Sequence, residues 1–436
     1  MQMLFCKEGE DMKKIGVALL GLGVVGGGTY EILRDKREMI KRNEGIDLEV
    51  KHVLERNLQR CADLGVDPSI VTQNIEDIVN DDEVQIVAEF FGGVEPAKSY
   101  LLKALQNGKS VVTANKEMFS KCWHELESAA SKSGAGLYFE ASCVGGVPVI
   151  RTLSESMQAN CITMLKGIVN GTTNYILSKM SDASVDYHTC LKEAQKLGYA
   201  EANPTADVEG FDATYKNSIL SSLAYHRRVP VEKVYREGIS GISVEDIAIG
   251  KELGYEIKLL AISKVTDEGK IEARVHLCFL PKDHPLSSVK GSFNALFMHG
   301  DSVDDVMLYG RGAGAFPTGS AIVSDIVFAG SKETHRRYDF MCEEVQDEAF
   351  ASDFSTSYYI RIAVENRDDA LAKTSAVFVK NGISIRSVLK KTMKNGEECF
   401  VFVTAKTKES NMQNTLRQIE NLDVVNGVAA LIRVEE

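Results

Sequence analysis

Short apolar runs alternate with longer segments of helical periodicity along the first third of the chain. Residues 29–42 repeat apolar positions at helical spacing, directly after a glycine-rich turn. Each apolar run ends in small or polar residues, which is typical of the carboxyl edge of a parallel sheet. The alternation predicts an α/β domain with a Rossmann-type sheet in residues 1–148. Its strands are predicted at residues 14–20, 47–54, 84–90, 110–113 and 136–139.

The turn after the first strand has the glycine spacing of a dinucleotide site. It reads GLGVVG at residues 21–26, with a strand before it and a helix after it. Glycines at this spacing allow a tight turn and a close approach of the backbone to a pyrophosphate at a helix N-terminus. We therefore expect NAD or NADP to bind here. The residues predicted to contact the cofactor are Gly21, Gly23, Val24, Val25, Gly26 and, at the end of the third apolar run, Gly92.

The tip of the second predicted strand decides the cofactor preference. An acidic residue there binds the ribose 2′-hydroxyl of NAD, whereas an arginine suits the 2′-phosphate of NADP. This chain has both, Glu55 and Arg56, and the next residue is the neutral Asn57. Because Arg56 is followed by a neutral residue, we expect Arg56 to point into the groove and NADP to be the preferred cofactor. The alternatives are that Glu55 governs the groove or that both are exposed loop charges.

Residues 194–216 hold most of the candidate chemistry. Asp212 and Lys216 are four positions apart, so a helix places them on one face. Glu201 and Asp207 precede that helix in a segment broken by glycine, asparagine and proline. One interpretation is an exposed acidic loop with an ion pair. The other is a pocket in which carboxylates bind an ammonium group and a buried lysine transfers a proton.

A second lysine, Lys116, follows the predicted strand 110–113. A lysine after a strand is usually solvated, but one beside a dinucleotide crevice is also a candidate contact for cofactor or substrate. Both interpretations remain open from its position alone.

Six blocks of this sequence, in one order along residues 14–330, resemble the homoserine dehydrogenase family. The family signature covers Ala194, Gly198, Tyr199, Ala200, Asn203, Pro204, Asp207, Val208, Gly210, Asp212 and Lys216. The flanking blocks are GLGVVGGG at 21–28, TANKE at 113–117, EASCVGGVP at 140–148, GIVNGTTNYIL at 167–177 and GRGAGAFPT at 310–318. The chain departs from the family at Ala202–Asn203, where Pro-Asp is common, and at Cys143, where valine is common.

The resemblance implies an NAD(P)-dependent interconversion of L-aspartate 4-semialdehyde and L-homoserine. The forming alkoxide needs a proton and a nearby positive charge, which a lysine can supply when burial or a second cation lowers its pKa. By resemblance, Lys216 is the acid/base and Lys116 its partner beside the nicotinamide. The same resemblance assigns substrate binding to Glu201, Asp207, Asp212, Gly171 and Thr172, and a further cofactor contact to Gly312.

The EASCVGGVP block has a second implied role. In the resembled family it binds a monovalent cation, Na⁺ or K⁺, and the corresponding positions here are Glu140, Cys143, Gly145 and Val147. A glycine-rich turn can aim several carbonyl oxygens at one point. The alternative is a tight turn that only joins two domains.

The remaining chain is predicted to form two further domains. Residues 149–304 are expected to be an α+β substrate and dimerisation domain, and residues 305–330 to return to the nucleotide domain. The charged stretch 331–354 is predicted to be a linker, and residues 355–436 a separate domain that truncation near residue 353 would remove without unfolding the rest.

The strands and helices of this last domain are predicted in the order β-α-β-β-α-β. This order resembles a ferredoxin-like ACT domain, which implies feedback control with L-threonine as effector. The first turn reads NRDDA at 366–370 instead of carrying the usual Pro-Gly pair. A domain kept only for packing between subunits is the alternative.

Composition narrows the class of protein. The 436 residues are 44% hydrophobic and 26% charged, as in ordinary globular chains of two or three domains. A formal charge of −12 disfavours nucleic-acid and anionic membrane partners. Nine cysteines without a CxxC pair favour a reducing cytoplasm. A homodimer or homotetramer is expected from the resemblance.

Three other classes of protein share some of these sequence features. An aspartate-semialdehyde dehydrogenase would share the nucleotide site and the substrate, but it needs an activated cysteine and a phosphate site. A purely regulatory amino-acid-binding protein would not need Lys116 and Lys216, and both are present. A fusion to an aspartokinase is not expected, because no kinase-sized segment precedes Lys14.

Overall fold

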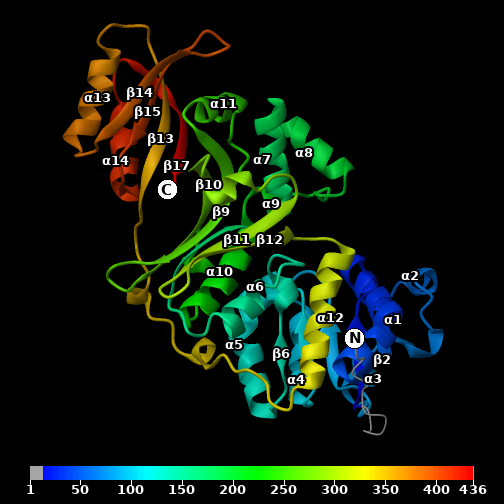
Figure 1. Cartoon of the computed structure of the whole chain (residues 1–436). Coiled ribbons are helices and arrows are strands. Elements are labelled where there is room, and N and C mark those ends of the chain that lie inside the picture. The colour runs from blue at the N-terminus through cyan, green and yellow to red at the C-terminus, as the bar shows by residue number, and fades with distance from the viewer. Residues whose placement is uncertain (1–12, 436) are drawn as a thin grey trace, which may run out of the picture. The chain divides into compact units, whose positions relative to one another are not determined.

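The computed structural model describes residues 13–435, so the first twelve residues of the predicted nucleotide domain and Glu436 lie outside the described residues. The chain folds into two compact units, and many of their helices and strands are labelled in Figure 1. Of the described residues, unit 1 contains 13–158, 226–228 and 311–344. Unit 2 contains 159–225, 229–310 and 345–435.

Unit 1 is built on a six-stranded sheet. Its strands are β1 (Lys13–Leu20), β2 (Ile46–Leu54), β3 (Val71–Thr72), β4 (Ile86–Glu89), β5 (Ser110–Thr113) and β6 (Leu137–Tyr138). Its helices are α1 (Val24–Glu44), α2 (Leu58–Asp63), α3 (Glu76–Val79), α4 (Ala97–Gln106), α5 (Lys116–Ser133), α6 (Val149–Arg151) and α12 (Ala315–Ser331).

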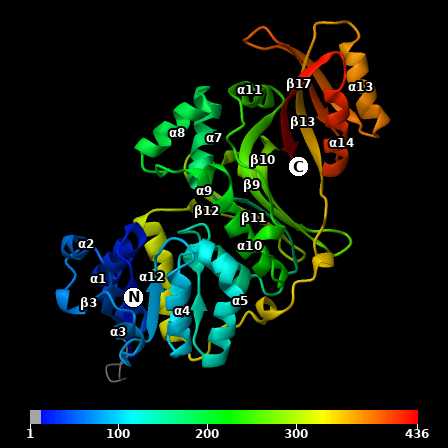
Figure 2. The same ribbon diagram turned by 180° about the vertical axis from the view of Figure 1, so that it is seen from behind.

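The strand order of this sheet is β3-β2-β1-β4-β5-β6, and every neighbouring pair is parallel. This is the order of the Rossmann fold, so the predicted Rossmann-type domain is confirmed. The order reverses between β1 and β4, where loops after the two strands diverge and leave the crevice that binds nucleotides. Helices α4 and α5 cover the face of the sheet opposite to α1 and α12 (Figure 2).

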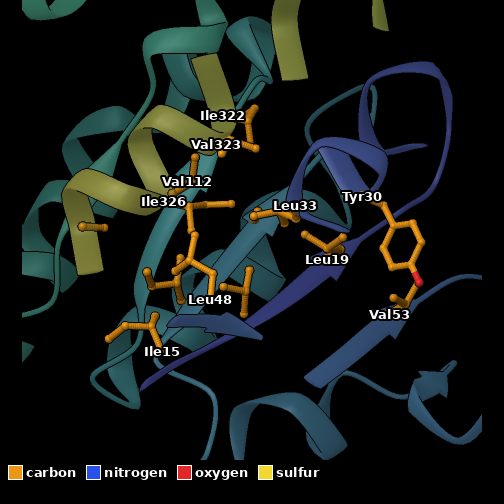
Figure 3. Close-up of a cluster of buried hydrophobic side chains, with 14 of the residues drawn as sticks. Ile15, Leu19, Tyr30, Leu33, Leu48, Val53, Val112, Ile322, Val323 and Ile326 are labelled. Atoms are coloured by element: carbon orange, nitrogen blue, oxygen red, sulfur yellow. The ribbon is translucent and has the colours of Figure 1, made fainter. Parts of the chain in front are cut away.

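One hydrophobic core joins the sheet to α1 and α12 (Figure 3). Leu19 of β1, Leu33 of α1 and Ile326 of α12 are among its buried residues. Each such side chain contributes about 1.5–3 kcal/mol when it is fully buried. The two helices approach closely because Gly28 lacks a side chain: a Cβ there would lie 2.6 Å from the carbonyl oxygen of Ala315.

Helix α12 returns to unit 1 as expected, but residues 305–310 do not. They belong to β12, which pairs within the sheet of unit 2. The predicted linker is also more ordered than its charge suggests. Tyr338 is buried, its backbone N–H donates to Glu127 Oε1 at 3.0 Å, and its ring lies 5.3 Å from that of Trp123. The first half of this segment is therefore packed against α5.

Unit 2 contains an 11-stranded sheet and seven helices among the described residues. Its strands are β7 (Ile162–Ile168), β8 (Tyr235–Arg236), β9 (Tyr255–Val265), β10 (Ile271–Pro281), β11 (Phe293–Gly300), β12 (Asp304–Arg311), β13 (Ser355–Val364), β14 (Ile385–Thr392), β15 (Glu398–Thr404), β16 (Thr407–Lys408) and β17 (Val425–Val434). Its helices are α7 (Gly171–Ala183), α8 (Tyr187–Lys196), α9 (Thr205–Val208), α10 (Phe211–Tyr225), α11 (Val244–Glu252), α13 (Ala370–Lys380) and α14 (Glu409–Glu420).

The C-terminal elements follow the predicted β-α-β-β-α-β order. Their strands are arranged as β17-β13-β15-β14, with antiparallel neighbours, which is the ferredoxin-like arrangement. The sequence predicts a unit separated by a linker, but β17 pairs with β10 in parallel, and one sheet runs through both parts (Figure 1). A strand pairing of this kind is not encoded in local sequence patterns.

A buried ion cluster reinforces this junction. The carboxylate of Glu435 pairs with Arg274, with Lys264 at 3.1 Å and with Lys166 at 3.6 Å. Burial alone would raise the pKa of the Glu435 carboxyl, but the three positive charges outweigh burial and hold this pKa well below its usual range. Arg274 and Lys166 have 0% and 2% exposed side chains, so Glu435 compensates charges that water does not reach.

Candidate active site

The glycine-rich turn of unit 1 is shaped by close backbone contacts. Gly21 has φ +97°, which favours glycine, and a Cβ on Gly26 would lie 2.2 Å from the carbonyl oxygen of Gly21. At Gly23 the opposite holds, because nothing lies within 4 Å of a Cβ placed there. Gly23 is the N-cap of the 21-residue helix α1. The turn thus offers an open surface and helix N–H groups to a pyrophosphate.

The other predicted cofactor residues of unit 1 lie in the first turn of α1 or in loops. Val24, the first residue of α1, is 69% exposed, which is unusual for a large apolar side chain, and Val25 is half-buried. Gly92 is exposed shortly after the end of β4. Gly312 lies directly beside Gly145, since a Cβ on Gly145 would be 2.3 Å from the Gly312 carbonyl oxygen.

The two charged residues at the tip of β2, Glu55 and Arg56, differ in their contacts. Glu55 Oε2 accepts the N–H of Leu22 at 2.7 Å. Its Oε1 accepts the N–H groups of Arg56 and Asn57 at 2.8 and 2.9 Å. Both oxygens of Glu55 therefore stabilise the backbone of the two turns, while the side chain of Arg56 is exposed.

Sequence reasoning missed Arg60 at this tip. Its Nε donates to the carbonyl oxygen of Leu22 at 3.0 Å, so a second guanidinium lies against the glycine-rich turn. A Cβ on Gly27 would lie 2.6 Å from Arg60 Nη2, so this glycine leaves room for the guanidinium beside the turn. The available sequence signal was a second arginine four positions after Arg56.

Lys116 begins α5, and the residue before it fixes this helix start. Asn115 Oδ1 accepts the N–H of Met118 at 3.1 Å, and its Nδ2 donates to the carbonyl oxygen of Gly93 at 2.8 Å. Asn115 Nδ2 also lies 3.5 Å from the carboxylate of Glu89, the last residue of β4, which the sequence analysis did not single out. Burial raises the pKa of Glu89 to about 7, although Thr113 Oγ1 donates to its carboxylate at 2.5 Å.

In unit 2 the structure brings Lys216 and Asp212 together on α10. Lys216 Nζ donates to Asp212 Oδ2 at 2.7 Å and to the carbonyl oxygen of Val169 at 2.7 Å. Both side chains are buried, with 10% and 6% exposed area. The exposed-loop interpretation of this pair is therefore wrong, because a surface ion pair would be solvated.

The neighbouring Asn217 connects α10 to the sheet by hydrogen bonds. Its Nδ2 donates to the carbonyl oxygens of Ile262 on β9 and Arg274 on β10, at 3.1 and 3.2 Å. These bonds fix the rotation of α10 about its axis, and with it the direction of Lys216. A polar residue at this position gives no sequence signal of such a role.

Asp207 joins the same group through Asn170, which the sequence analysis did not single out. Asn170 Nδ2 donates to Asp207 Oδ1 at 2.7 Å and to Asp212 Oδ2 at 2.9 Å. Asn170 lies inside the GIVNGTTNYIL block, so the signal was its place between a strand and a helix.

The other predicted substrate residues surround this group less closely. Gly171 is the first residue of α7, and Thr172 Oγ1 donates to the carbonyl oxygen of Tyr199 at 2.6 Å. Glu201 is exposed, and its backbone carbonyl accepts Gln195 Nε2 at 3.0 Å. The structure therefore gathers Asp207, Asp212 and Lys216 but gives no ion pair to the Glu201 side chain among the interactions of the described residues.

The predicted cation turn lies entirely in unit 1. Glu140 uses its carboxylate to accept the N–H groups of Ile150 and Arg151 at 2.9 and 2.8 Å. Val144 and Gly145 both have positive φ, 56° and 51°, and Cys143 is fully buried. Among residues 13–435, no three His, Cys, Asp or Glu side chains gather in a way that could hold a metal ion.

Two family models match the chain. One, described as homoserine dehydrogenase, matches residues 148–327, and the other, described as its NAD-binding domain, matches residues 21–140. The homoserine dehydrogenase of Bacillus subtilis is 39% identical over 97% of this chain and 99% of its own length. The chain belongs to the homoserine dehydrogenase family. The corresponding enzyme of Corynebacterium glutamicum is also 39% identical, over 97% and 96%.

Solved homoserine dehydrogenases share the fold. The structure from Thiobacillus denitrificans has 39% identity and a TM-score of 0.89, and the match covers 98% of this chain and 99% of that one. A hyperthermophilic archaeal homoserine dehydrogenase in complex with NADPH has 27% identity and a TM-score of 0.62. That match covers 72% of this chain and 97% of the archaeal one.

Membership of the homoserine dehydrogenase family confirms the predicted enzyme class, an oxidoreductase with an NAD(P)-binding domain, and disfavours the aspartate-semialdehyde dehydrogenase alternative. Neither family model extends past residue 327, so the ACT assignment of residues 355–436 stays a prediction. Within residues 13–435, none of the helices has the length and apolar character needed to cross a membrane.

Proposed function

We propose that this chain reversibly reduces L-aspartate 4-semialdehyde to L-homoserine, with Lys216 as the residue that transfers the proton. One observation carries the assignment of Lys216: its ammonium group is buried and held by Asp212 and by the Val169 carbonyl oxygen, both at 2.7 Å. A lysine fixed in this way can give a proton to a forming alkoxide and take it back in the reverse direction.

The surrounding residues fit a substrate that carries an ammonium and a carboxylate group. Glu201, Asp207 and Asp212 provide the negative charge that an ammonium group requires. The N-terminus of α7, at Gly171 and Thr172, provides N–H donors for the carboxylate. When bound, the nicotinamide supplies the hydride to the aldehyde carbon. Lys116, at the positive N-terminal side of α5, orients the reacting oxygen in this proposal.

Consumption of NAD(P)H with aspartate 4-semialdehyde tests this function directly. Turnover without inorganic phosphate, with homoserine as product, supports the proposal. Phosphate-dependent reduction of NADP⁺ by the same aldehyde would instead indicate the acyl-phosphate chemistry of an aspartate-semialdehyde dehydrogenase, which oxidises the aldehyde, and would contradict the proposal.

We infer that NADP is the preferred cofactor. The carboxylate oxygens of Glu55 already accept three backbone N–H groups, whereas the guanidinium of Arg56 is exposed beside them. Arginine matches a phosphate with bidentate, charge-assisted hydrogen bonds.

Replacing Arg56 with alanine should raise KM for NADPH about ten- to a hundred-fold more than KM for NADH, because a charge-assisted hydrogen bond contributes roughly 1.5–3 kcal/mol. Steady-state kinetics with both cofactors measure this difference. Arg34→Ala is a matched control, since Arg34 is a partly exposed arginine on α1 that pairs with Asp35 and not with the turn. Equal effects on both cofactors would show that Arg56 points away from the ribose and that Glu55 sets the cofactor preference.

The turn at residues 140–147 fits a monovalent cation held by backbone oxygens. The carboxylate of Glu140 is engaged by the N–H groups of Ile150 and Arg151, so the chain would use carbonyl oxygens there, the ligands that such cations accept. The residues that would hold it are Glu140, Cys143, Gly145 and Val147. The cation would stabilise a turn whose Val144 and Gly145 have left-handed backbone conformations.

We also propose that residues 355–436 form an ACT domain that binds L-threonine, and that the chain assembles as a homodimer or homotetramer. The ferredoxin-like strand order supports the first point. The turn at residues 366–370, which lacks the usual Pro-Gly pair, is held by ion pairs instead. Arg367 pairs with Asp369 at 2.7 Å and with Asp423 at 3.0 Å. β14 lies at the end of the sheet order with Val388 39% exposed, which leaves an edge for a second copy.

L-Threonine should bind the full-length chain, and its affinity should fall when NADP and homoserine are bound, because an inhibitor and a substrate that favour different states weaken each other equally. Calorimetric titration with and without these ligands measures both effects. L-Serine is a matched control ligand that lacks one methyl group. Absence of threonine binding would indicate that the domain serves only for packing.

A further inference from the structure

Asn170 occupies the junction between the central sheet of unit 2 and the candidate proton-transfer residue. It lies two residues after the end of β7, is 5% exposed and is the N-cap of α7. Its neighbour in the chain, Val169, provides the carbonyl oxygen that accepts Lys216 Nζ at 2.7 Å.

The orientation of the Asn170 side-chain amide follows from its partners. Its Oδ1 accepts the N–H of Thr173 at 2.8 Å and the hydroxyl of Thr173 at 3.0 Å. Because a backbone N–H can only donate, the oxygen must face α7 and the NH₂ group must face the other side. There it donates to Asp207 Oδ1 at 2.7 Å and Asp212 Oδ2 at 2.9 Å.

This amide therefore links two carboxylates that would otherwise repel each other. The oxygen of Asp212 that accepts Asn170 Nδ2 also accepts Lys216 Nζ, so one atom receives both donors. Residues 169 and 170 thus hold Lys216 in two ways, directly through a carbonyl oxygen and indirectly through Asp212.

We propose that Asn170 is a positioning residue for proton transfer, which aligns Asp212 and Lys216 and holds Asp207 beside them. The inference rests on the proposed role of Lys216. Asparagine alone combines the two needed groups at this length: an oxygen with two lone pairs for the helix cap and two N–H donors for the two carboxylates. Aspartate has no donor when ionised, and serine has one hydroxyl proton.

Asn170→Ser separates the two functions of the side chain. Serine caps helices about as well as asparagine, so α7 keeps its N-terminal acceptor while the bridge to the two carboxylates is lost. We expect kcat to fall roughly ten- to a hundred-fold, because a displacement of about 1 Å of a reacting group can cost 10²-fold. KM for homoserine should change much less, and the melting temperature should fall little.

Asn170→Asp adds a second readout. Aspartate also caps α7, but it places a third carboxylate against Asp207 and Asp212. Its kcat should therefore fall further than that of Asn170→Ser. A residue that only caps the helix would give equal kcat values for the two variants, so this order distinguishes positioning from capping.

Asn174→Ser is the matched control. Asn174 is a buried asparagine one turn further along α7, and its Nδ2 donates to the carbonyl oxygens of Val289 and Phe293 at 3.3 and 3.0 Å, not to a carboxylate. Its loss should lower the melting temperature while kcat stays close to that of the unmodified enzyme.

The possible results decide the matter. Lower kcat in Asn170→Ser, a further loss in Asn170→Asp and unchanged kcat in Asn174→Ser support the positioning role. Unchanged kcat in both Asn170 variants, or a rise in KM alone, would overturn it. If Lys216→Met retains turnover, the proposed proton donor itself is wrong, which is a separate result from the failure of Asn170.

Discussion

Replacing Lys216 with methionine should lower kcat by roughly 10²- to 10⁴-fold, the usual contribution of a positioned acid or base. Methionine has a similar length and keeps the apolar contacts of the buried stem, but it can neither donate to Asp212 nor transfer a proton. Cofactor affinity should hardly change, because the glycine-rich turn belongs to the other compact unit. Stopped-flow measurement of NADPH oxidation gives the rate, and fluorescence titration of NADPH gives the affinity.

Lys258→Met is the matched control for this variant. Lys258 is likewise a buried lysine of unit 2, and burial lowers its pKa to about 8. Its Nζ donates to the Val289 carbonyl oxygen and not to Asp207 or Asp212. Its loss should affect stability more than turnover. Retention of most of kcat in Lys216→Met would show that another group supplies the proton.

Replacing Glu435 with glutamine should lower the free energy of unfolding by about 3–5 kcal/mol, the usual cost of removing one partner of a buried ion pair. Arg274 would then keep Glu272 as an ionic partner at 3.0 Å but lose Glu435, and Lys166 would lose the carboxylate at 3.6 Å, although both side chains stay buried. Urea unfolding followed by circular dichroism measures the change. The exposed pair of Glu268 and Lys270 is the control, and Glu268→Gln should change stability by about 1 kcal/mol or less.

The ionised carboxylate of Glu435 also makes the stability of the protein depend on pH. Because the folded-state pKa of Glu435 is depressed, its contribution is fully present above the unfolded pKa of about 4.3 and is lost as the pH falls through the folded value. The difference in stability between the unmodified chain and Glu435→Gln should therefore be largest at neutral pH and shrink in acid. A difference that does not depend on pH would show that Glu435 is not the charged partner.

Truncation near residue 353 is a related test, and here the structure reverses the sequence-based expectation. The deletion removes Glu435 together with β17, which pairs with β10. An unpaired β10 edge and the loss of the Glu435 carboxylate beside the buried Arg274 and Lys166 are expected to give an unfolded or aggregated product instead of a folded catalytic part. Threonine control is therefore better tested in the full chain.

The sequence by itself determined the local elements and the family. Regular alternation of apolar runs and the glycine turn predicted the Rossmann strands to within one residue at β1 and β2, because buried parallel strands and their turns leave strong local patterns. The spacing of Asp212 and Lys216 likewise placed them on one helical face, since helix geometry is fixed over four residues.

Only the tertiary structure decided what these residues contact. Asn170 meets Asp207 and Asp212 across 37 and 42 positions, and Glu435 meets Arg274 across 161. No local period encodes such distances along the chain, because they arise when strands from separate segments enter one sheet. For that reason the candidate proton donor could be named from the sequence, whereas the amide that holds it and the strand that attaches the C-terminal part became visible only in the fold.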